Sequence, residues 1–490
     1  MGKAIMLQGT GSHVGKSLLT AALCRILVQE GYSVAPFKAQ NMALNSFVTP
    51  DGLEIGRAQA LQAEACGIEP EIEMNPILLK PAGEMSAQVV VMGKPLAHMT
   101  AREYREYYLD KALPLVKQAL NSLMQRFDVV VMEGAGSPVE INLRDRDIVN
   151  MAAVKLANAP VLLVGDIDRG GVFASLYGTM ELLPREERGL VRGIIVNKFR
   201  GDLSLFADGV AMLEGLTHKP VLGVIPFLPH LSLDEEDSVA LEDYSHTTTD
   251  AAITIAVPRL PRLSNFTDFA PLGRENGVRV IYTTKPGDIL NADAVVLPGT
   301  KNTAADFRFL QATGLTESIA TAALRGVCIV GICGGYQMLG ERIYDPDGVE
   351  GADAFVDALG LLPVTTVFRK TKRTVRSVAQ CNLPFYSGIV HGYEVHMGES
   401  SALGTPAFAI DGKCDGCVQG EIWGTYIHGV FDNDEFRHSF INYLRNKKGL
   451  APLSAPFHYQ AFRVAELDRL AAHVRAHLDV AQVLKIVGLN

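Results

Sequence analysis

Short apolar runs alternate with stretches of helical periodicity through the first half of the chain. The runs cover residues 4–7, 33–37, 127–132, 159–165, 194–196 and 221–226. Runs of this length are typical of buried strands, and the long amphipathic stretch at 101–127 predicts a helix that crosses from one strand to the next. These six runs with helices between them predict a doubly wound parallel sheet, which binds its ligands beyond the carboxyl ends of the strands.

A second alternation of the same kind begins at Ala251. Its apolar runs cover residues 252–257, 278–283, 293–299 and 327–333. The stretch between the two alternations is acidic and rich in hydroxyl side chains, which is typical of a linker, and the end of the chain has the apolar spacing of a helix. We therefore divide the chain into an α/β domain at 1–233, an acidic linker at 234–250, a second α/β domain at 251–445 and a helical segment at 446–490.

The composition and the net charge exclude several classes of partner. The chain has 490 residues, of which 48% are apolar, and this is enough to bury large cores. The net charge of −9 argues against a nucleic-acid partner. No apolar run reaches the length of a membrane span, and seven cysteines scattered along the chain fit a reducing compartment. We expect a cytoplasmic protein that binds neither nucleic acid nor a membrane.

The first apolar run leads into a glycine-rich loop and then into a helical pattern. The residues that we expect to bind nucleotide there are Gly9, Thr10, Gly11, Ser12, His13, Val14, Gly15, Lys16 and Ser17. Backbone N–H groups of such a loop face phosphate, the lysine reaches the terminal phosphates, and the serine hydroxyl can hold Mg²⁺. The loop has Thr10 where the strict pattern requires glycine, and in this it resembles dethiobiotin-synthetase-like P-loop enzymes, which activate carboxylates with ATP.

Three further residues at strand ends extend this predicted ATP site. Lys38 follows the second run and is placed to touch the γ-phosphate or an acyl phosphate. Glu133 directly follows the 127–132 run, where P-loop proteins place a second contact to Mg²⁺, so Ser17 and Glu133 are the predicted metal ligands. Asn197 follows the fifth run and is a candidate for contacting the purine.

Charged residues gather in two loops that also follow strand ends. The candidates for substrate contact there are Asn142, Arg144, Asp147, Asp168 and Arg169. A run of charges usually marks a solvated loop, whereas a position beyond the carboxyl end of a parallel strand favours ligand contact. The sequence leaves both interpretations open.

A second chemical centre is predicted at Cys333, where an apolar run turns sharply into a helical pattern. The flanking glycines allow a tight nucleophile elbow, a helix N-terminus favours a thiolate, and the N–H of Gly334 points toward a developing oxyanion. Gly299 follows another strand and could supply the second oxyanion contact. This pattern is typical of a class I glutaminase, with His428 as the base. Glutaminases usually carry glutamate two residues after that histidine, but this chain has Val430, so either another group orients the imidazole or the pair acts as a dyad.

Nine longer motifs together resemble the cobyric acid synthase family over roughly residues 4 to 440. They are PFKAQNMALNS, MNPILLKP, EGAGSPVEINLRDRDIVNM, DIDRGGVFASLYGT, NKFRGD, LPGTKNT, GICGGYQMLG, GYEVHMG and GTYIHGVF. The resemblance implies a dethiobiotin-synthetase-like first domain and a class I glutamine amidotransferase-like second domain. It also implies amidation of the b, d, e and g carboxylates of (adenosyl)cobyrinic acid a,c-diamide in cobalamin biosynthesis.

In that scheme the substrates are ATP, glutamine and a corrinoid, and Mg²⁺ is the cofactor. No cobalt site is expected in the protein, because the corrin ring carries its own metal. Whether the chain forms a homo-oligomer is left open. One alternative is the sister enzyme cobyrinic acid a,c-diamide synthase, which has the same two-domain plan. A more distant alternative is a partitioning-type ATPase switch that carries an inactive glutaminase-like module.

Overall fold

The computed structural model describes residues 2–81, 86–233, 251–351 and 354–489. The chain forms two compact units. The first consists of Met1–Ala43, Ile55–Glu236 and Phe462–Asn490, and the second of Leu44–Glu54 and Asp237–Ala461. The predicted linker at 234–250 lies outside the described residues. Among those described, no helix is both long and apolar enough to cross a membrane.

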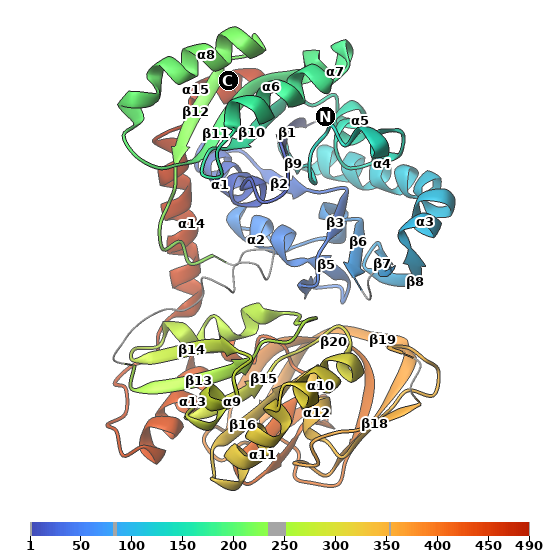
Figure 1. Cartoon of the computed structure of the whole chain (residues 1–490), viewed down its shortest axis with the longest axis vertical. Helices are drawn as coiled ribbons and strands as arrows, with labels where there is room; N and C mark the ends of the chain where they lie inside the picture. The colour runs from blue at the N-terminus through green and yellow to red at the C-terminus, as the bar shows by residue number, and fades with distance from the viewer. Residues whose placement is uncertain (1, 82–85, 234–250, 352–353, 490) are drawn as a thin grey trace. The chain divides into compact units, whose positions relative to one another are not determined.

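The first unit is built on a parallel sheet of six strands in the order β12-β11-β10-β1-β9-β2 (Figure 1). The strands are β1 (Lys3–Gly9), β2 (Val34–Phe37), β9 (Val129–Glu133), β10 (Val161–Asp166), β11 (Val191–Phe199) and β12 (Val221–Pro226). Every residue of β9 and β10 is buried, as expected for strands covered on both faces. The doubly wound sheet predicted from the six apolar runs is confirmed.

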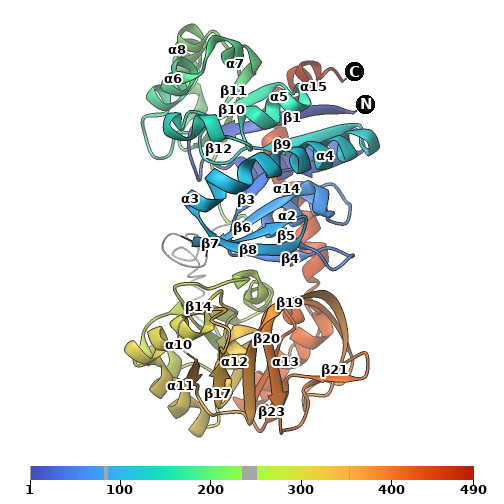
Figure 2. The same ribbon diagram turned by 90° about the vertical axis from the view of Figure 1, so that its right-hand side faces the viewer.

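Helices between these strands supply the crossovers. They are α1 (Lys16–Gln29), α2 (Arg57–Ala65), α4 (Leu109–Arg126), α5 (Met151–Ala157), α6 (Val172–Leu182), α7 (Arg185–Leu190) and α8 (Ala207–Thr217). The stretch predicted as one helix at 101–127 is α3 (Ala101–Glu103), a π-helical turn η2 (Tyr104–Tyr108) and then α4 (Figure 2). Its apolar face is buried through residues such as Val116 and Leu120.

A small second sheet of the first unit was not predicted as such. Its strands are β3 (Gln40–Met42), β6 (Ile77–Pro81), β7 (Ser86–Val91) and β8 (Lys94–Thr100). It continues the chain beyond β2 and ends directly at α3. In this small sheet β3 runs parallel to β6, whereas β6, β7 and β8 are antiparallel to one another.

The second unit contains another sheet of six strands, in the order β14-β13-β15-β16-β24-β23. Its strands are β13 (Ile253–Pro258), β14 (Val278–Thr283), β15 (Ala294–Leu297), β16 (Cys328–Ile332), β23 (Cys417–Gln419) and β24 (Ile422–Thr425), and only β23 is antiparallel to its neighbour. The helices of this unit are α9 (Pro286–Leu290), α10 (Thr303–Ala312), α11 (Leu315–Leu324), α12 (Gly334–Leu339) and α13 (Asp434–Lys447). The four predicted strands are all present.

A mixed sheet completes the second unit. Its long antiparallel pair is β19 (Val364–Cys381) with β20 (Ile389–Ala402), and it also contains β17 (Arg342–Tyr344), β18 (Phe355–Asp357), β21 (Phe408–Ile410) and β22 (Lys413–Asp415). In addition, the short pair β4 (Ser46–Val48) and β5 (Glu54–Gly56) includes residues that belong to this unit. Val48 packs with Tyr393 and Val395 of β20 in a small apolar cluster.

The end of the chain returns to the first unit, which the sequence division did not anticipate. The helical pattern at 462–487 forms two helices, α14 (Tyr459–Arg475) and α15 (Val480–Val487). Leu467 and Leu470 join the apolar cluster that also holds α1. Ion pairs from Arg463 to Glu64 and from Arg25 to Asp468 fix α14 beside α2 and α1 (Figure 1). Residues 462–490 are thus part of the first unit and not a separate segment.

Candidate functional site: a phosphate loop and a cysteine elbow

The predicted phosphate loop connects β1 to α1. Gly15 has a φ of 94°, and a Cβ there would lie 2.2 Å from Asn197 Nδ2, so glycine is required for both conformation and space. The Lys16 ammonium donates to the carbonyl oxygens of Gly11 (2.7 Å) and Gly136 (3.2 Å). The lysine thus links the phosphate loop to the segment that follows β9. Both lie at the carboxyl edge of the sheet, where phosphates bind in this architecture.

Glu133 is the centre of a buried polar cluster beside that loop. One carboxylate oxygen accepts from the Ser17 hydroxyl (2.8 Å) and the Lys38 ammonium (2.9 Å), and the other from the Gln62 amide (2.6 Å). Burial favours the protonated form, but the Lys38 charge and these three hydrogen bonds outweigh it and lower the pKa of Glu133 below its ordinary value. The cluster therefore holds a carboxylate and a hydroxyl, the hard oxygen ligands that suit Mg²⁺.

Gln62 is a member of this cluster that the sequence did not single out as functional. It lies on α2, where a polar residue interrupts an alanine-rich and otherwise buried helix face. That interruption is the signal that could have identified it.

Asn197 and its neighbour support the loop from β11. The Asn197 amide donates to the carbonyl of Val14 (2.9 Å), and the Lys198 ammonium donates to the carbonyl of His13 (2.6 Å). Lys198 also pairs with Asp166 at the end of β10. Asn197 was expected to contact the purine; in the structure its amide nitrogen holds the phosphate loop.

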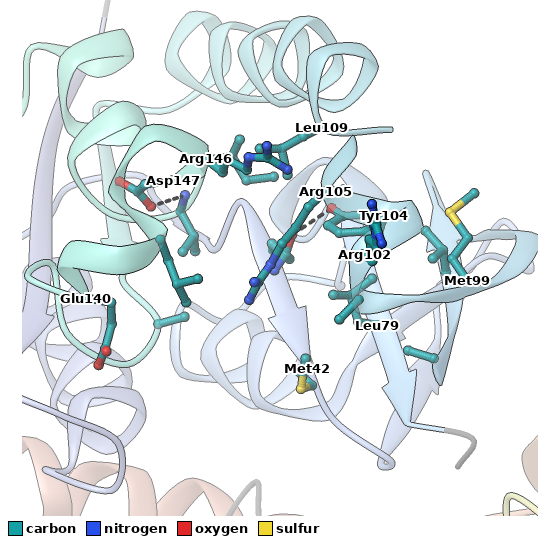
Figure 3. Close-up of a pocket in the computed structure, with 18 of the residues that line it drawn as sticks. Met42, Leu79, Met99, Arg102, Tyr104, Arg105, Leu109, Glu140, Arg146 and Asp147 are labelled. Atoms are coloured by element: carbon teal, nitrogen blue, oxygen red, sulfur yellow. Dashed lines mark hydrogen bonds between the residues drawn. The ribbon is translucent and has the colours of Figure 1, made fainter. Parts of the chain in front are cut away.

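A cavity of about 1100 Å³ opens beside the loop that follows β9 (Figure 3). Of the five predicted substrate residues, Arg144 and Asp147 line it. Arg144 pairs with Glu187. The Asp147 carboxylate accepts from the backbone N–H groups of Val149, Asn150 and Ala152, just before and at the start of α5.

The other three predicted substrate residues do not line this cavity. Asn142 is exposed on a 3-10 turn, η3 (Ile141–Arg146), Arg169 is exposed after β10, and Asp168 pairs with Arg200. The two charged loops therefore differ, because one faces the cavity and the other holds a surface ion pair.

Cys333 lies at a sharp turn between β16 and α12 and has φ 52° and ψ −108°. A cysteine rarely adopts a positive φ, and strain of this kind is characteristic of functional elbows. The glycines on either side make the turn possible. A Cβ at Gly335 would lie 2.0 Å from the carbonyl oxygen of Leu297, and one at Gly331 would lie 2.7 Å from the backbone of Gly335.

His428 follows β24, the strand next to β16, and its side chain is 1% exposed. Its Nδ1 lies 2.7 Å from Oδ2 of Asp268, and the Cys333 thiol is close enough to raise the pKa of the imidazole. The second oxygen of Asp268 accepts from the N–H of Gly429 (3.0 Å). The sequence left open what orients the imidazole, and in the structure Asp268 is the group in contact with it.

The electrostatic balance around His428 favours its protonated form. Burial alone would lower the pKa of this imidazole, but the charges and hydrogen bonds of Asp268 and Cys333 outweigh it and raise the pKa to about 10. An imidazolium held between a carboxylate and a thiol sulfur is the arrangement that stabilises a thiolate nucleophile.

The two residues predicted to bind the oxyanion both lie at the elbow. A Cβ at Gly299 would lie 3.0 Å from Cε1 of His428, and one at Gly334 would lie 2.8 Å from the side chain of Thr300. Gly334 is the first residue of α12, so its N–H points out of the helix N-terminus. The Cys333 thiol, the imidazole and both glycines therefore meet in one place.

Comparison with known proteins agrees with these two centres. Residues 5–239 match the CobQ/CobB/MinD/ParA nucleotide binding domain, and residues 254–436 match the CobB/CobQ-like glutamine amidotransferase domain. Fold and site thus define a glutamine amidotransferase ligase with a nucleotide-binding domain.

Full-length relatives narrow this class to one family. The chain is 51% identical to a cobyric acid synthase of Moorella thermoacetica, over 100% of this chain and 98% of the relative. It is 51% identical to that of Desulforamulus reducens (100% and 99%) and 48% identical to that of Photorhabdus laumondii (99% and 98%). The chain belongs to the cobyric acid synthase family.

Proposed function

We propose that the chain amidates the b, d, e and g carboxylates of (adenosyl)cobyrinic acid a,c-diamide, using ATP and glutamine, to give (adenosyl)cobyric acid. The observation that carries this proposal is the presence of both centres in one chain: a cysteine elbow with His428 and Asp268, and a phosphate loop with a buried carboxylate at Glu133. The relatives' shared name, over nearly their full length, supports the choice of substrate.

In the second unit, the Cys333 sulfur attacks the amide carbon of glutamine. The C–N bond breaks, His428 gives its proton to the leaving nitrogen, and ammonia and a glutamyl thioester form. Backbone N–H groups at Gly299 and Gly334 stabilise the oxyanion of the tetrahedral intermediate. Water then hydrolyses the thioester to glutamate and restores the thiol.

In the first unit, a corrinoid carboxylate oxygen attacks the γ-phosphorus of ATP and ADP leaves. Ammonia attacks the resulting acyl phosphate, the amide forms and phosphate leaves. The Lys16 and Lys38 ammonium groups lie beside the loop where the triphosphate charge must be neutralised. Ser17 and Glu133 would hold Mg²⁺, which would supply positive charge to the triphosphate.

The test is an amidation assay that follows product mass, with glutamine and ATP and with either cobyrinic acid or its a,c-diamide as substrate. Four successive mass steps from the diamide are the expected result. Two steps from cobyrinic acid and none from the diamide would instead identify cobyrinic acid a,c-diamide synthase activity. ATP turnover that needs neither glutamine nor corrinoid, with no amidated product, would overturn the proposal.

A further inference from the structure

The cavity in the first unit has the size and lining of a binding site for a large, flat, carboxylated ligand. Its walls come from β3, β6, β7, β8, the helical stretch from α3 through η2 to the start of α4, η3 and the loop after β9. Met42, Leu79, Met99 and Leu109 contribute apolar surface, as Figure 3 shows. A volume of about 1100 Å³ exceeds what a small substrate such as an amino acid needs.

Charged residues of both signs line this cavity, and arginines outnumber carboxylates. The arginines are Arg102, Arg105, Arg144 and Arg146, and the carboxylates are Glu106, Glu140 and Asp147. Arg102 pairs with Glu106, and Arg144 pairs with Glu187. Arg105, by contrast, forms no hydrogen bond or ion pair with any residue in the described part of the chain. Its guanidinium extends into the cavity in Figure 3.

The backbone around Arg105 is held in place by the contacts of its neighbours. Arg105 lies on the π-helical turn η2, and such turns are frequent at functional sites. The neighbouring Tyr104 is buried and donates from its hydroxyl to the Gln40 side chain (2.7 Å). Tyr104 also packs against Tyr108, with ring centroids 5.8 Å apart. These contacts fix the backbone from which the Arg105 side chain extends, and the N–H donors of its guanidinium stay available to a ligand.

The cavity begins close to the phosphate site, at the ends of two adjacent strands. β2 and β9 pair side by side, and Lys38 and Glu133 stand at their carboxyl ends. Gln40 lies two residues after Lys38 and Ala135 two residues after Glu133, and both line the cavity. The Lys16 ammonium reaches the carbonyl of Gly136, the next residue of that loop. A carboxylate bound in the cavity therefore lies next to the place where ATP would donate its γ-phosphate.

From these observations we infer that the cavity is the corrinoid site and that Arg105 binds a peripheral carboxylate of the substrate. This inference rests on the proposed function. A corrin ring offers a flat apolar macrocycle with carboxylates around its edge, which matches the apolar walls and the available guanidinium. Arg105 is a positioning and specificity residue, because it binds charge that the reaction removes.

Loss of that charge gives Arg105 a role in product release. Each amidation converts a carboxylate into a neutral amide, and a guanidinium binds a carboxylate more strongly because the hydrogen bonds are charge-assisted. The diamide therefore binds more tightly than the fully amidated product. Removing the guanidinium should weaken substrate binding more than product binding.

The experiment compares Arg105→Gln with the charge-conserving Arg105→Lys and with Arg192→Gln, an exposed arginine on β11 that does not line the cavity. Equilibrium dialysis with the coloured diamide and with cobyric acid measures both affinities, and steady-state kinetics measures KM and kcat. In Arg105→Gln we expect the affinity for the diamide to fall roughly 10- to 100-fold. The ratio of the affinity for the diamide to the affinity for cobyric acid should then approach one. Arg105→Lys should retain part of the preference, and Arg192→Gln all of it.

Glutamine hydrolysis and ATP binding are measured on the same variants. Both should stay at the wild-type level, because Arg105 belongs to neither centre. Unchanged diamide affinity and unchanged KM in Arg105→Gln, with active wild-type enzyme, would overturn the inference and leave the proposed function intact. A wild-type enzyme that neither binds nor amidates the diamide would overturn the proposed function itself.

Discussion

The imidazole Nδ1 of His428 lies 2.7 Å from a carboxylate oxygen of Asp268, which is 160 residues earlier in the chain. Asp268 belongs to the 3-10 turn η6 (Phe266–Phe269) and is 3% exposed. The same carboxylate binds the N–H of Gly429, so it fixes both the ring and the backbone beside it. Val430 stands two residues after the histidine, where glutaminases usually carry glutamate, and Asp268 is the carboxylate in contact with the imidazole.

Replacing this carboxylate should impair glutamine hydrolysis selectively. In Asp268→Asn the amide cannot stabilise the imidazolium and can favour the wrong tautomer, an effect that costs a serine protease about 10⁴-fold in kcat. Because a thiol ionises more readily than a serine hydroxyl, we expect a loss of roughly 10²-fold or more here. Glutaminase assays measure the change.

Amidation with free ammonia provides the control for Asp268→Asn, since it bypasses Cys333 and His428. It should stay near the wild-type rate. Asp293→Asn, which removes a surface partner of Lys448, should alter neither activity. Full glutaminase activity in Asp268→Asn would mean that the two residues Cys333 and His428 suffice alone.

The same contact predicts how stability depends on pH. The pKa of His428 is raised to about 10 in the folded chain, whereas an unfolded histidine titrates near 6.5. The folded state therefore binds the proton more tightly, and this stabilisation is complete below about pH 6.5 and lost as the pH rises toward 10. The difference in melting temperature between wild type and His428→Gln should shrink over that range. A constant difference from pH 6 to 10 would contradict the raised pKa.

The two centres should be separable at Cys333. Cys333→Ala removes the nucleophile, so glutamine-dependent amidation should be abolished. Synthesis with free ammonia at high pH, where the unprotonated amine is abundant, should continue. Product mass with each nitrogen source measures both, and loss of the ammonia reaction as well would refute the division of chemistry between the units.

Residues that lie close together in sequence were the predictable part of this molecule. The glycine loop at Gly9–Ser17 and the elbow around Cys333 each arise within a few residues, and the alternation of apolar runs was enough to predict both parallel sheets. Asp268 could not be found in this way. It stands in a short turn with no motif around it, and only the tertiary fold brings it to His428.

The long strand pair β19 and β20 escaped prediction for a different physical reason. Residues 369–371 of β19 are exposed in succession, and β20 is exposed at both of its ends. A strand with this pattern lacks the continuous apolar run or the clean alternation that marks a buried strand. The return of α14 to the first unit was equally hidden, because helical spacing shows that a face will be buried but not against which partner.

The elbow makes a strict demand on residue size at Gly335. In Gly335→Ala the new Cβ would lie 2.0 Å from a backbone oxygen of Leu297, so the turn or β15 must shift. We expect a loss of about 1–3 kcal/mol or more in the stability of the second unit, together with loss of glutaminase activity. Trp423, the single tryptophan, is buried in this unit and reports its denaturant midpoint by fluorescence. Gly287→Ala in α9 is the control, because nothing lies within 4 Å of its new Cβ, and an unchanged midpoint in both variants would contradict the geometry.

The buried carboxylate of Glu133 should be indispensable to the ATP-dependent step. Glu133→Gln removes the charge that faces Lys38 and Ser17, and with it the carboxylate expected to hold Mg²⁺. We expect corrinoid amidation to fall by at least roughly 10²-fold with either glutamine or ammonia, since one preorganised electrostatic contact is commonly worth that much. Cys333 lies in the other unit, so the alkylation rate of its thiol by a glutamine analogue should be unchanged. Ser17→Ala, which keeps the carboxylate and its contact with Lys38, should lose less activity than Glu133→Gln. If Glu133→Gln retained the wild-type rate with ammonia, Glu133 would have no part in phosphoryl transfer, and the metal would have to be held elsewhere.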